Sequence, residues 1–479
     1  MRDLVIVLTY VSFLTIGTMS PFVLSLGYVW VDLFAPQYLG WSPLSYLPVS
    51  FIIGAAALAA YLLLDRRAPP RITLPTLLFV LIGLWITATT SWAALPTASW
   101  AKWDVAFKAL MFAAFLPFVV RSRVQIEAFV HVYIFSMAAH ILPWAVKTVI
   151  TGGGYGQSLG LVGSNVLWLS ESSAVAAIGI MLTPLLLTLR RHSVLLPRGR
   201  VRDAVYLGTA LGGLFASIGT FARTAVVGLG VLGIAMFLRS KHKVGFLMAS
   251  AVVGAGLFAV TSDQWTARIS TIEDYASETS AFVRILVWRW TIGYAAQHPF
   301  GGGFRVWLTN HIVIASSNPN EAATEQVGRA FHNIYFAVLG EHGYPGLFLY
   351  GLLIVVLFAS LQRVIKLTAL QPVHEWAHDL AKALQIAMAV LLTCGNFIDI
   401  SFEPLVWYLF TMVVCLREYV RRVVSAPKAG VSEVARNRAP LPGAAARPGP
   451  AGSAASAASA ANPSGFGAPS GFGDAAARS

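Results

Sequence analysis

The stretch SSAVAAIGIMLTPLLLTLRR, residues 172–191, decides the fold class of this chain. It runs from Ser172 to Leu189 without a charged residue and then ends in two adjacent arginines. About 20 apolar residues in a helix match the thickness of the hydrocarbon core of a bilayer, and arginines mark the end that meets water. The stretch therefore predicts a transmembrane helix.

Apolar runs of this kind recur along the chain. Of its 479 residues, 57% are hydrophobic and only 11% are charged, which is too few charges to cover soluble domains of this length. The first run has no clear small-residue cleavage site, so we interpret it as a retained helix. We expect membrane spans at residues 4–30, 46–64, 74–94, 105–120, 126–149, 172–189, 203–220, 224–238, 244–261, 332–360, 379–398 and 404–420. The sequence thus predicts an all-α, polytopic membrane protein of about twelve transmembrane helices.

Basic residues give the expected orientation of these spans. Because cytoplasmic loops are enriched in Lys and Arg, we expect the basic connections and both termini in the cytoplasm. The same clusters account for the net charge of +13, and no zinc-finger, RNP or basic-helix motif points to a nucleic-acid partner. The basic residues fall in every second connection, at Arg66, Arg67, Arg71, Arg121, Arg123, Arg190 to Arg202, Arg239, Lys241, Lys243, Arg363 and Lys366.

The chain is expected to divide into two parts. Residues 1–422 form the transmembrane part, whereas residues 423–479 are rich in Ala, Gly, Pro and Ser and end in the near-repeat PSGFGAPSGFG at 463–473. Such a composition cannot bury enough apolar surface to offset its chain entropy. We expect a disordered cytoplasmic tail, either inert or a segment for interaction.

One connection, residues 262–331, is large enough to build a site, and the alternation of charge places it on the outer face. It opens with a capping-box pattern from Ser270 to Glu273 and continues with SETSAFVRILVWRWTIGYAAQ at 277–297. This segment has helical propensity but carries Arg284 and Arg289 and too few apolar residues to span. The sequence predicts interfacial helices in this loop.

The second half of this loop carries candidate ligand-binding residues. Arg284 and Trp288 are four residues apart and share a helix face, and Gly301, Gly302 and Gly303 follow. Glycines permit close approach of the backbone to a ligand, although a flexible turn is the commoner meaning of such a run. Arginines on an interfacial helix are often anchors that reach lipid headgroups.

Two further ionisable residues lie at the outer ends of predicted spans. Arg223, in SIGTFARTAVVG, has no acidic neighbour in sequence, and His332 opens a span in RAFHNIYFAVLGEHGYPGL. Ionisable groups at such positions are rare and usually functional. The alternatives are an anchor to lipid phosphates for the arginine and an interfacial polar residue for the histidine.

Two arginines and a histidine on one face favour one kind of chemistry. Guanidinium groups suit phosphate oxygens and stabilise a departing diphosphate. A neutral imidazole accepts a proton from an attacking hydroxyl near neutral pH. The combination predicts group transfer from a lipid diphosphate.

The sequence resembles the O-antigen ligase and polymerase superfamily of bacterial envelope enzymes in three blocks. FARTA at 221–225 is similar to the family's arginine-bearing helix start. The family's R-x3-W…P-x-G-x-G block is matched by Arg284, Trp288, Pro299, Gly301 and Gly303. Its most specific block, H-N-x-Y…E-x-G-x-x-G, is matched by His332, Asn333, Tyr335, Glu341, Gly343 and Gly346. The layout of spans around one large loop extends the resemblance over residues 1–422.

A narrower resemblance concerns the start of the chain. MRDLVIVL…YVWVDLFAPQYLGW is similar to the subgroup of O-glycosylation ligases associated with exosortase A. The chain departs from the family pattern at Ala222, where Ser is frequent, and from the subgroup at Glu171 and Ser172. These departures bear on the identity of the acceptor more than on the type of reaction that the resemblance implies.

The resemblance implies a metal-independent glycosyltransferase of the bacterial inner membrane. It implies that the enzyme moves a preassembled glycan from undecaprenyl diphosphate to an acceptor hydroxyl, such as that of lipid A core, on the periplasmic face. Arg223 and Arg284 would bind the diphosphate and stabilise its departure, and His332 would act as the general base or orient the acceptor. No cofactor is implied, although Glu273, Asp274 and Glu278 keep a metal site open. Further substrate contacts are expected from Arg289, Trp288, Gly301, Gly303, Asn333 and Tyr335.

Other interpretations stay open from the sequence. A lipid-linked glycan polymerase would use the same donor with another acceptor. A glycan transporter would show an internal repeat and charged residues near the membrane midplane, and neither is convincing here. Other acids that could replace His332 as the base are Glu171, Glu278, Glu325 and Asp399.

Overall fold

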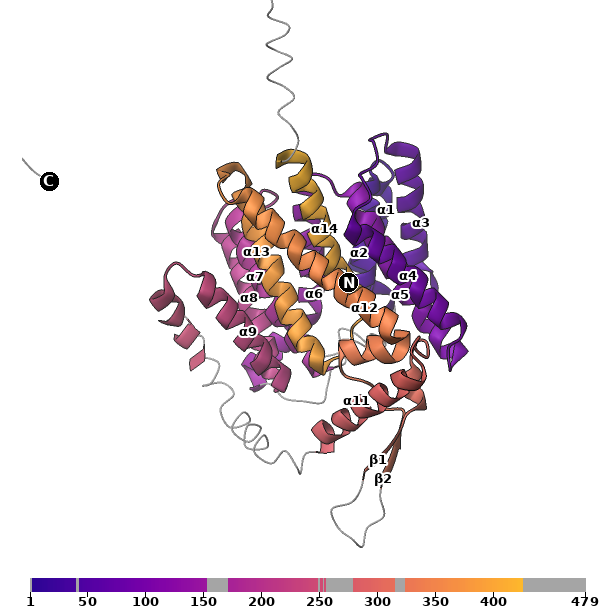
Figure 1. Cartoon of the computed structure of the whole chain (residues 1–479). Coiled ribbons are helices and arrows are strands. Elements are labelled where there is room, and N and C mark those ends of the chain that lie inside the picture. Colours follow the sequence, from indigo (N-terminus) through magenta and orange to yellow (C-terminus); the bar gives the residue numbers. More distant parts are fainter. Residues whose placement is uncertain are drawn as a thin grey trace, which may run out of the picture. The chain divides into compact units, whose positions relative to one another are not determined.

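The structure, a computed structural model, describes residues 2–39, 43–152, 171–248, 250–252, 254–255, 279–314 and 324–424. Figure 1 shows them as a bundle of helices with a small β-hairpin at one end. The helices are α1 Arg2–Gly17, α2 Pro21–Phe34, α3 Val49–Leu64, α4 Leu74–Ser91, α5 Pro96–Val119, α6 Arg123–Thr151, α7 Ser172–His192, α8 Arg200–Gly219, α9 Arg223–Arg239, α11 Thr279–Gln297, α12 Ile334–Thr368, α13 Glu375–Cys394 and α14 Pro404–Val424. Short 3-10 turns are η1 Pro36–Tyr38, η2 Pro43–Tyr46, η4 Val306–Thr309, η5 Pro372–His374 and η6 Gly395–Phe397.

The predicted helices are largely confirmed. The opening stretch forms α7, and the loop segment predicted at 277–297 forms α11, Thr279–Gln297. The hairpin was not expected: β1 His311–Ile314 pairs antiparallel with β2 Thr324–Val327, with His311 opposite Val327. The predicted span at 244–261 is only partly within the described residues, and the capping box at 270–273 and the tail from residue 425 lie outside them.

The prediction of one continuous helix from residue 4 to residue 30 is wrong. The chain breaks between α1 and α2, where Ser20 is extended and Pro21 occupies the first turn of α2. Proline lacks the amide hydrogen that would continue a preceding helix but fits the start of a new one. The two helices pack closely, because a Cβ atom at Gly17 would lie 2.5 Å from Leu24 Cγ.

Five helices of the described residues are long and apolar enough to cross a membrane: Leu74–Ser91, Arg123–Ile150, Ser172–His192, Ile334–Thr368 and Pro372–Phe397. A helix of about 20 residues spans about 30 Å, the thickness of the hydrocarbon core. The protein is therefore a polytopic membrane protein with an almost entirely helical fold. The larger number of about twelve spans stays a prediction.

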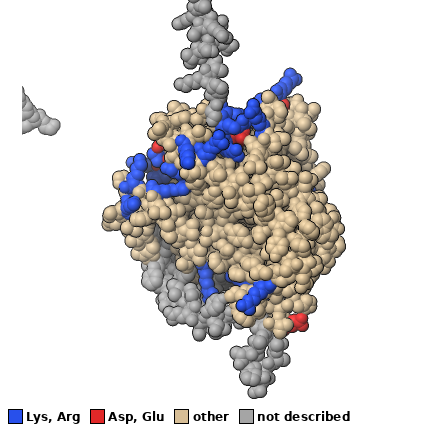
Figure 2. Space-filling view, in the orientation of Figure 1, with Lys and Arg blue, Asp and Glu red and all other residues tan. Residues whose placement is uncertain are grey.

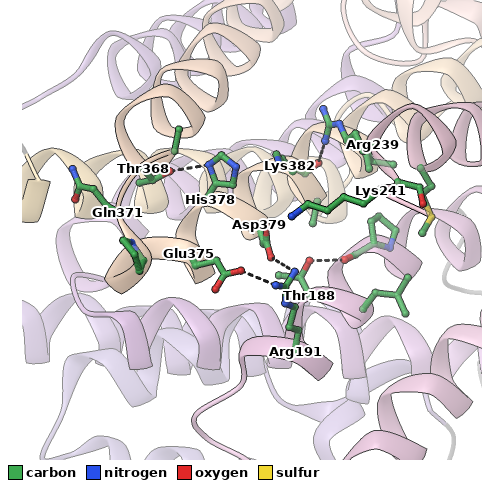
Figure 3. A pocket seen from close by; sticks show the side chains of 18 of the residues that line it. Thr188, Arg191, Arg239, Lys241, Thr368, Gln371, Glu375, His378, Asp379 and Lys382 are labelled. Carbon is green, nitrogen blue, oxygen red and sulfur yellow. Dashed lines mark hydrogen bonds and ion pairs between the residues drawn. The ribbon is translucent and has the colours of Figure 1, made fainter. Parts of the chain in front are cut away.

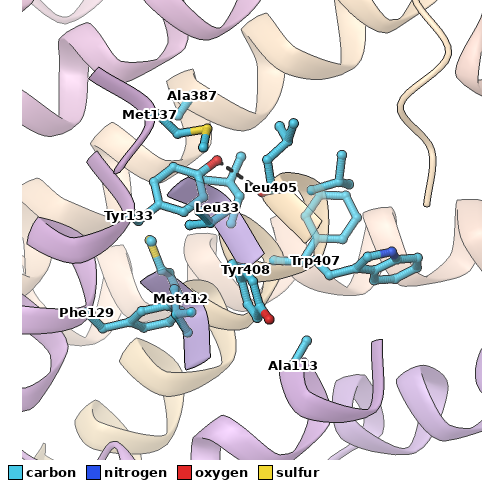
Figure 4. Packing of buried hydrophobic residues seen from close by; sticks show 14 of the residues in the cluster. Leu33, Ala113, Phe129, Tyr133, Met137, Ala387, Leu405, Trp407, Tyr408 and Met412 are labelled. Carbon is cyan, nitrogen blue, oxygen red and sulfur yellow. Dashed lines mark hydrogen bonds between the residues drawn. The ribbon is translucent and has the colours of Figure 1, made fainter. Parts of the chain in front are cut away.

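Helix α14 is the centre of the core. Every residue from Pro404 to Leu416 is buried, so this helix is surrounded by its neighbours. Figure 4 shows Tyr133 of α6 beside Leu405 and Tyr408 of α14, and the Tyr133 hydroxyl donates a hydrogen bond of 3.0 Å to the Leu405 carbonyl. This contact fixes the start of α14 against the interior of α6.

Charged side chains gather at the two ends of the bundle. Figure 2 shows many Lys and Arg at the upper end, a smaller group at the lower end, and a wide belt without charge between them on this face. The lower end carries α11, the β-hairpin and the start of α9 (Figure 1). We call it the α11 end, and we call the other the basic end. An uncharged belt between two charged ends is the surface that a membrane protein presents to lipid.

Candidate active site

The sequence-predicted arginines and histidine all lie at the α11 end. Arg223 is the first residue of α9, Arg284 and Arg289 lie in α11, and His332 stands two residues before α12. These positions come from three different helices, which Figure 1 shows converging at the lower end of the bundle.

The start of α9 is fixed by contacts with α7 and α13. Thr224, next to Arg223, donates a hydrogen bond of 3.0 Å from its hydroxyl to that of Ser173 at the start of α7. The backbone carbonyl of Thr224 accepts a hydrogen bond from the thiol of Cys394, at the end of α13. Arg223 is thereby held beside the helix ends that carry Glu171 on one side and Asn396 on the other.

His332 lies against an acid in a strained backbone conformation. Its Nδ1 atom is 3.3 Å from Glu171 Oε1, and both side chains are about one third exposed, at 33% and 35%. The backbone of His332 has φ of 47°, in the left-handed region that costs a non-glycine residue roughly 1–2 kcal/mol. Such strain persists where surrounding contacts impose it, and it concentrates at functional sites.

Hydrogen bonds of Asn333 and Tyr335 impose the backbone conformation of His332. The Asn333 side chain caps α12, accepting hydrogen bonds from the amides of Tyr335 at 2.9 Å and Phe336 at 3.2 Å. It also donates to the Asn396 carbonyl at 3.3 Å, and the Tyr335 hydroxyl donates to the Leu392 carbonyl at 3.1 Å. Asn333 and Tyr335, predicted as substrate-binding residues, thus hold the start of α12 against the end of α13.

Helix α11 approaches His332 through Trp288. The indole Nε1 donates a hydrogen bond of 2.9 Å to the Phe331 carbonyl, and the ring stacks on Phe336 with 5.2 Å between centroids. Arg284 is half-buried and lies one turn before Trp288 on the same face, whereas Arg289 is exposed and points about 100° away from Trp288. Arg284 therefore shares the helix face that meets the segment before His332, whereas Arg289 does not.

The glycines after α11 pack against a break in α12. Gly343 has φ of 67° and ψ of −168°, which interrupts the helix, and the carbonyls freed at Gly340 and Glu341 accept hydrogen bonds from Gly302 and Gly303 at 3.1 and 2.9 Å. A Cβ atom at Gly301 would lie 2.5 Å from the Glu341 carbonyl oxygen. The close approach that these glycines permit is to the chain itself.

Glu341 has a structural partner at this break. Its Oε1 accepts a hydrogen bond of 2.8 Å from the backbone amide of Arg305, which begins η4 with φ of 59°. The carboxylate is buried, with 5% of the residue exposed. Because a buried carboxylate needs such a bond, Glu341 and Arg305 fix the path of the segment that joins α11 to the hairpin.

A second group of charges lies between α13 and α14. Lys102 of α5 forms an ion pair with Glu403, just before α14. Burial raises the pKa of Asp399 to about 6, while the charge of Lys102 lowers it and that of Glu171 raises it. His332 also acts on Asp399, so this carboxyl group belongs to the electrostatic surroundings of the Glu171–His332 pair.

Sequence reasoning left several of these partners unassigned. Glu171 and Asp399 were considered only as alternative bases, and Lys102, Glu403 and Arg305 were not considered. Two acids in the short connection between the last two spans, at Asp399 and Glu403, were a usable signal. The pairing of Lys102 with Glu403 could not be predicted from the sequence, because 301 residues separate the two.

The fold and site define a class of protein: a helical membrane protein with arginines and an acid–histidine pair at one end. Residues 1–194 match a family of unknown function (DUF5935), and residues 207–351 match the O-antigen ligase family. The second match supports the O-antigen ligase and polymerase superfamily for this chain. No curated protein matches it at a significant level.

The residues of the candidate site fall in both matched regions and beyond them. The O-antigen ligase match includes Arg223, Arg284 and His332, whereas Glu171 falls in the region of unknown function and Asp399 lies beyond both matches. The expected relationship to this superfamily is confirmed over residues 207–351. The narrower resemblance to ligases associated with exosortase A is not confirmed by these matches.

Proposed function

We propose that this protein is a glycosyltransferase that transfers a preassembled glycan from undecaprenyl diphosphate to an acceptor hydroxyl, with lipid A core as the acceptor class to test first. The observation that carries the proposal is the Glu171–His332 pair, held on strained backbone and partly open to solvent. The match to the O-antigen ligase family supports a lipid-linked glycan as donor.

The reaction needs one proton transfer and one displacement. His332 Nε2 takes the proton of the acceptor hydroxyl while its oxygen attacks the anomeric carbon of the donor glycan. The bond between that carbon and the diphosphate oxygen breaks, and undecaprenyl diphosphate leaves with the electron pair. Glu171, at Nδ1, orients the imidazole and stabilises the imidazolium that forms, as the acid does in an acid–histidine pair.

The arginines provide the charge for the leaving group. Arg223 and Arg284 would bind the diphosphate oxygens and stabilise the negative charge that develops as the bond breaks. Two guanidinium groups at this end would supply positive charge that other enzymes take from a metal ion, so we propose a metal-independent reaction. The described side chains that are spaced to hold a metal ion, His192, Glu375 and Asp379, lie at the basic end.

We further propose that the protein lies in the bacterial inner membrane with the α11 end in the periplasm and both termini in the cytoplasm. The concentration of Lys and Arg at the basic end supports this orientation (Figure 2). Undecaprenyl diphosphate would then reach the site from the outer leaflet, beside the interfacial helix α11.

An in vitro transfer assay tests the function. Purified full-length protein receives donor alone or donor with lipid A core. Glycan on the lipid acceptor supports the ligase, and lengthened donor glycan without acceptor identifies a polymerase instead. Bound donor without either product would contradict the proposal and point to another acceptor or to transport.

The acid–histidine pair is tested in the same assay. Glu171→Gln keeps a hydrogen-bonding side chain but removes the charge, so we expect a lower kcat with a nearly unchanged KM. His332→Ala should reduce kcat by at least ~10²-fold, the usual contribution of general base catalysis. Unchanged kcat in both variants would remove the pair from the mechanism.

A further inference from the structure

A cavity of about 880 Å³ opens at the basic end, far from the α11 end in the fold. It lies between the ends of α7, α9 and α12 and the start of α13. Its volume is in the range of cavities that hold small ligands. Neither the family match nor the proposed reaction assigns it a role.

Cations outnumber acids in the lining of this cavity. Arg191, Arg239, Lys241 and Lys382 face two carboxylates, those of Glu375 and Asp379. Figure 3 shows these side chains converging from α7, α9, α13 and the connection after α9, with Lys241 extended toward the space between Asp379 and Lys382. The excess of positive charge favours an anionic ligand.

Both acids are already engaged by one arginine. Arg191 donates to Glu375 Oε1 at 2.6 Å and to Asp379 Oδ2 at 3.1 Å, and His192 Nε2 lies 2.8 Å from Asp379 Oδ2. Glu375, Asp379 and His192 are spaced to hold a metal ion, but the guanidinium occupies both carboxylates and repels a cation. The acids therefore serve to position Arg191.

The lysines are available for a ligand. Among the described residues, neither the Lys241 nor the Lys382 ammonium has an acid within ion-pair distance, and Arg239 donates to the Lys382 carbonyl at 2.6 Å and to Gln385 Oε1 at 2.7 Å. These last bonds hold Arg239 at the rim. Ammonium groups bind a phosphate as point charges and need no fixed geometry.

Apolar side chains lie beside the cations in this cavity. Its wall includes Leu187, Met236 and Ile386. A lining that combines cations with apolar residues suits a phosphate group that is joined to an acyl chain better than it suits a soluble anion.

We propose that this cavity binds the phosphate-bearing headgroup of an anionic membrane lipid, with Lys241 and Lys382 on the phosphate and the start of an acyl chain against Leu187, Met236 and Ile386. Basic pockets at the membrane boundary, between helices, are suited to such headgroups. The lipid would join α9 to α13, the two helices whose opposite ends carry Arg223 and Asn396.

Lipid binding to the full-length protein, delipidated in a neutral detergent, tests this proposal. Native mass spectrometry measures binding of phosphatidylglycerol and phosphatidylcholine to the wild type and to the Lys241→Gln/Lys382→Gln variant. Each cation near a membrane surface contributes about 1 kcal/mol to anionic lipid binding, so two correspond to roughly 30-fold weaker phosphatidylglycerol binding in the variant. Binding of phosphatidylcholine should be nearly the same in both proteins.

Arg363→Gln/Lys366→Gln is the matched control, because both residues are exposed on α12 at the same end and neither lines the cavity. It should leave phosphatidylglycerol binding within about threefold of the wild type. Equal losses in the two variants would overturn the proposal, as would equal binding of the two lipids by the wild type. Thermal stabilisation by millimolar inorganic phosphate but not by phosphatidylglycerol would also overturn it, because the occupant would then be a soluble anion.

Discussion

At the scale of single residues, the two arginines of α11 offer a direct test of the site. Arg284 is half-buried on the face that meets the segment before α12, and Arg289 is exposed on another face. Arg284→Ala should reduce kcat by ~10²- to 10³-fold, the loss seen when one donor to a developing charge is removed. Arg289→Ala should retain activity within a few-fold, although the sequence predicted both as substrate contacts.

The measurement is initial rate of glycan transfer at saturating acceptor, with the amount of folded protein in the membrane determined for each variant. If Arg289→Ala loses as much activity as Arg284→Ala, the assignment of faces in α11 is wrong. The same comparison decides whether Arg289 is an anchor to lipid headgroups or a ligand of the donor.

The raised pKa of Asp399 predicts a pH effect on stability. Burial raises this pKa to about 6 from an ordinary value of 3.8, so between pH 4 and pH 6 the folded protein holds a proton that the unfolded chain has lost. Stability contributed by this group is therefore full below pH 4 and falls as the pH rises through 6. Asp399→Asn removes the titration and mimics the neutral acid.

Thermal unfolding of the purified protein at pH 4.5 and pH 7.5 measures this effect. The Asn variant should gain in Tm relative to the wild type at pH 7.5 and differ little at pH 4.5. A gain that is the same at both pH values, or a loss at pH 7.5, would contradict the raised pKa.

At the scale of the secondary-structure elements, the break in α12 fixes the position of the segment after α11. Gly343→Ala places a Cβ atom against the Pro299 carbonyl and forces a positive φ on alanine. The backbone cost alone is about 1–2 kcal/mol, and the clash adds to it, so we expect a clearly lower Tm and loss of transfer. Gly351→Ala, in the same helix with open space at its Cβ position, should leave both unchanged.

Tm values of the two variants in the same detergent provide the comparison. Equal Tm values would show that α12 can straighten at Gly343 without cost. A normal Tm with lost transfer in Gly343→Ala would instead assign the break to the geometry of the site.

The sequence predicted the positions of the helices much better than the contacts between them. Residues 172–189 were expected as a span and form most of α7, because an apolar run of that length in a bilayer forms a membrane-spanning helix. The break before Pro21 was missed, since the apolar character continues across it. The pairing of His332 with Glu171 could not be predicted, because it depends on how α13 packs against both α7 and α12 and not on any local pattern.

At the scale of the whole molecule, the chain divides between residues 426 and 427, and all the described residues lie in the first unit. The site and the core lie in the first unit. We therefore expect a protein ending at Ala426 to keep its Tm and its rate of glycan transfer within about twofold, because it keeps the described core and every residue of the candidate site. A large loss of transfer with unchanged Tm would assign the second unit a role in the reaction.

The orientation of the molecule in the membrane is the property on which the donor and acceptor depend, and cysteine labelling tests it. Both native cysteines, Cys394 and Cys415, are buried, so background labelling by a membrane-impermeant maleimide should be low. Val313 in the hairpin is 62% exposed, and Leu370 at the basic end is 95% exposed. Because Lys and Arg mark the cytoplasmic side, intact spheroplasts should label Val313→Cys at once and Leu370→Cys only after permeabilisation. The reverse pattern would place the arginines and His332 in the cytoplasm, out of reach of a glycan on the periplasmic leaflet, and the proposed transfer could not occur there.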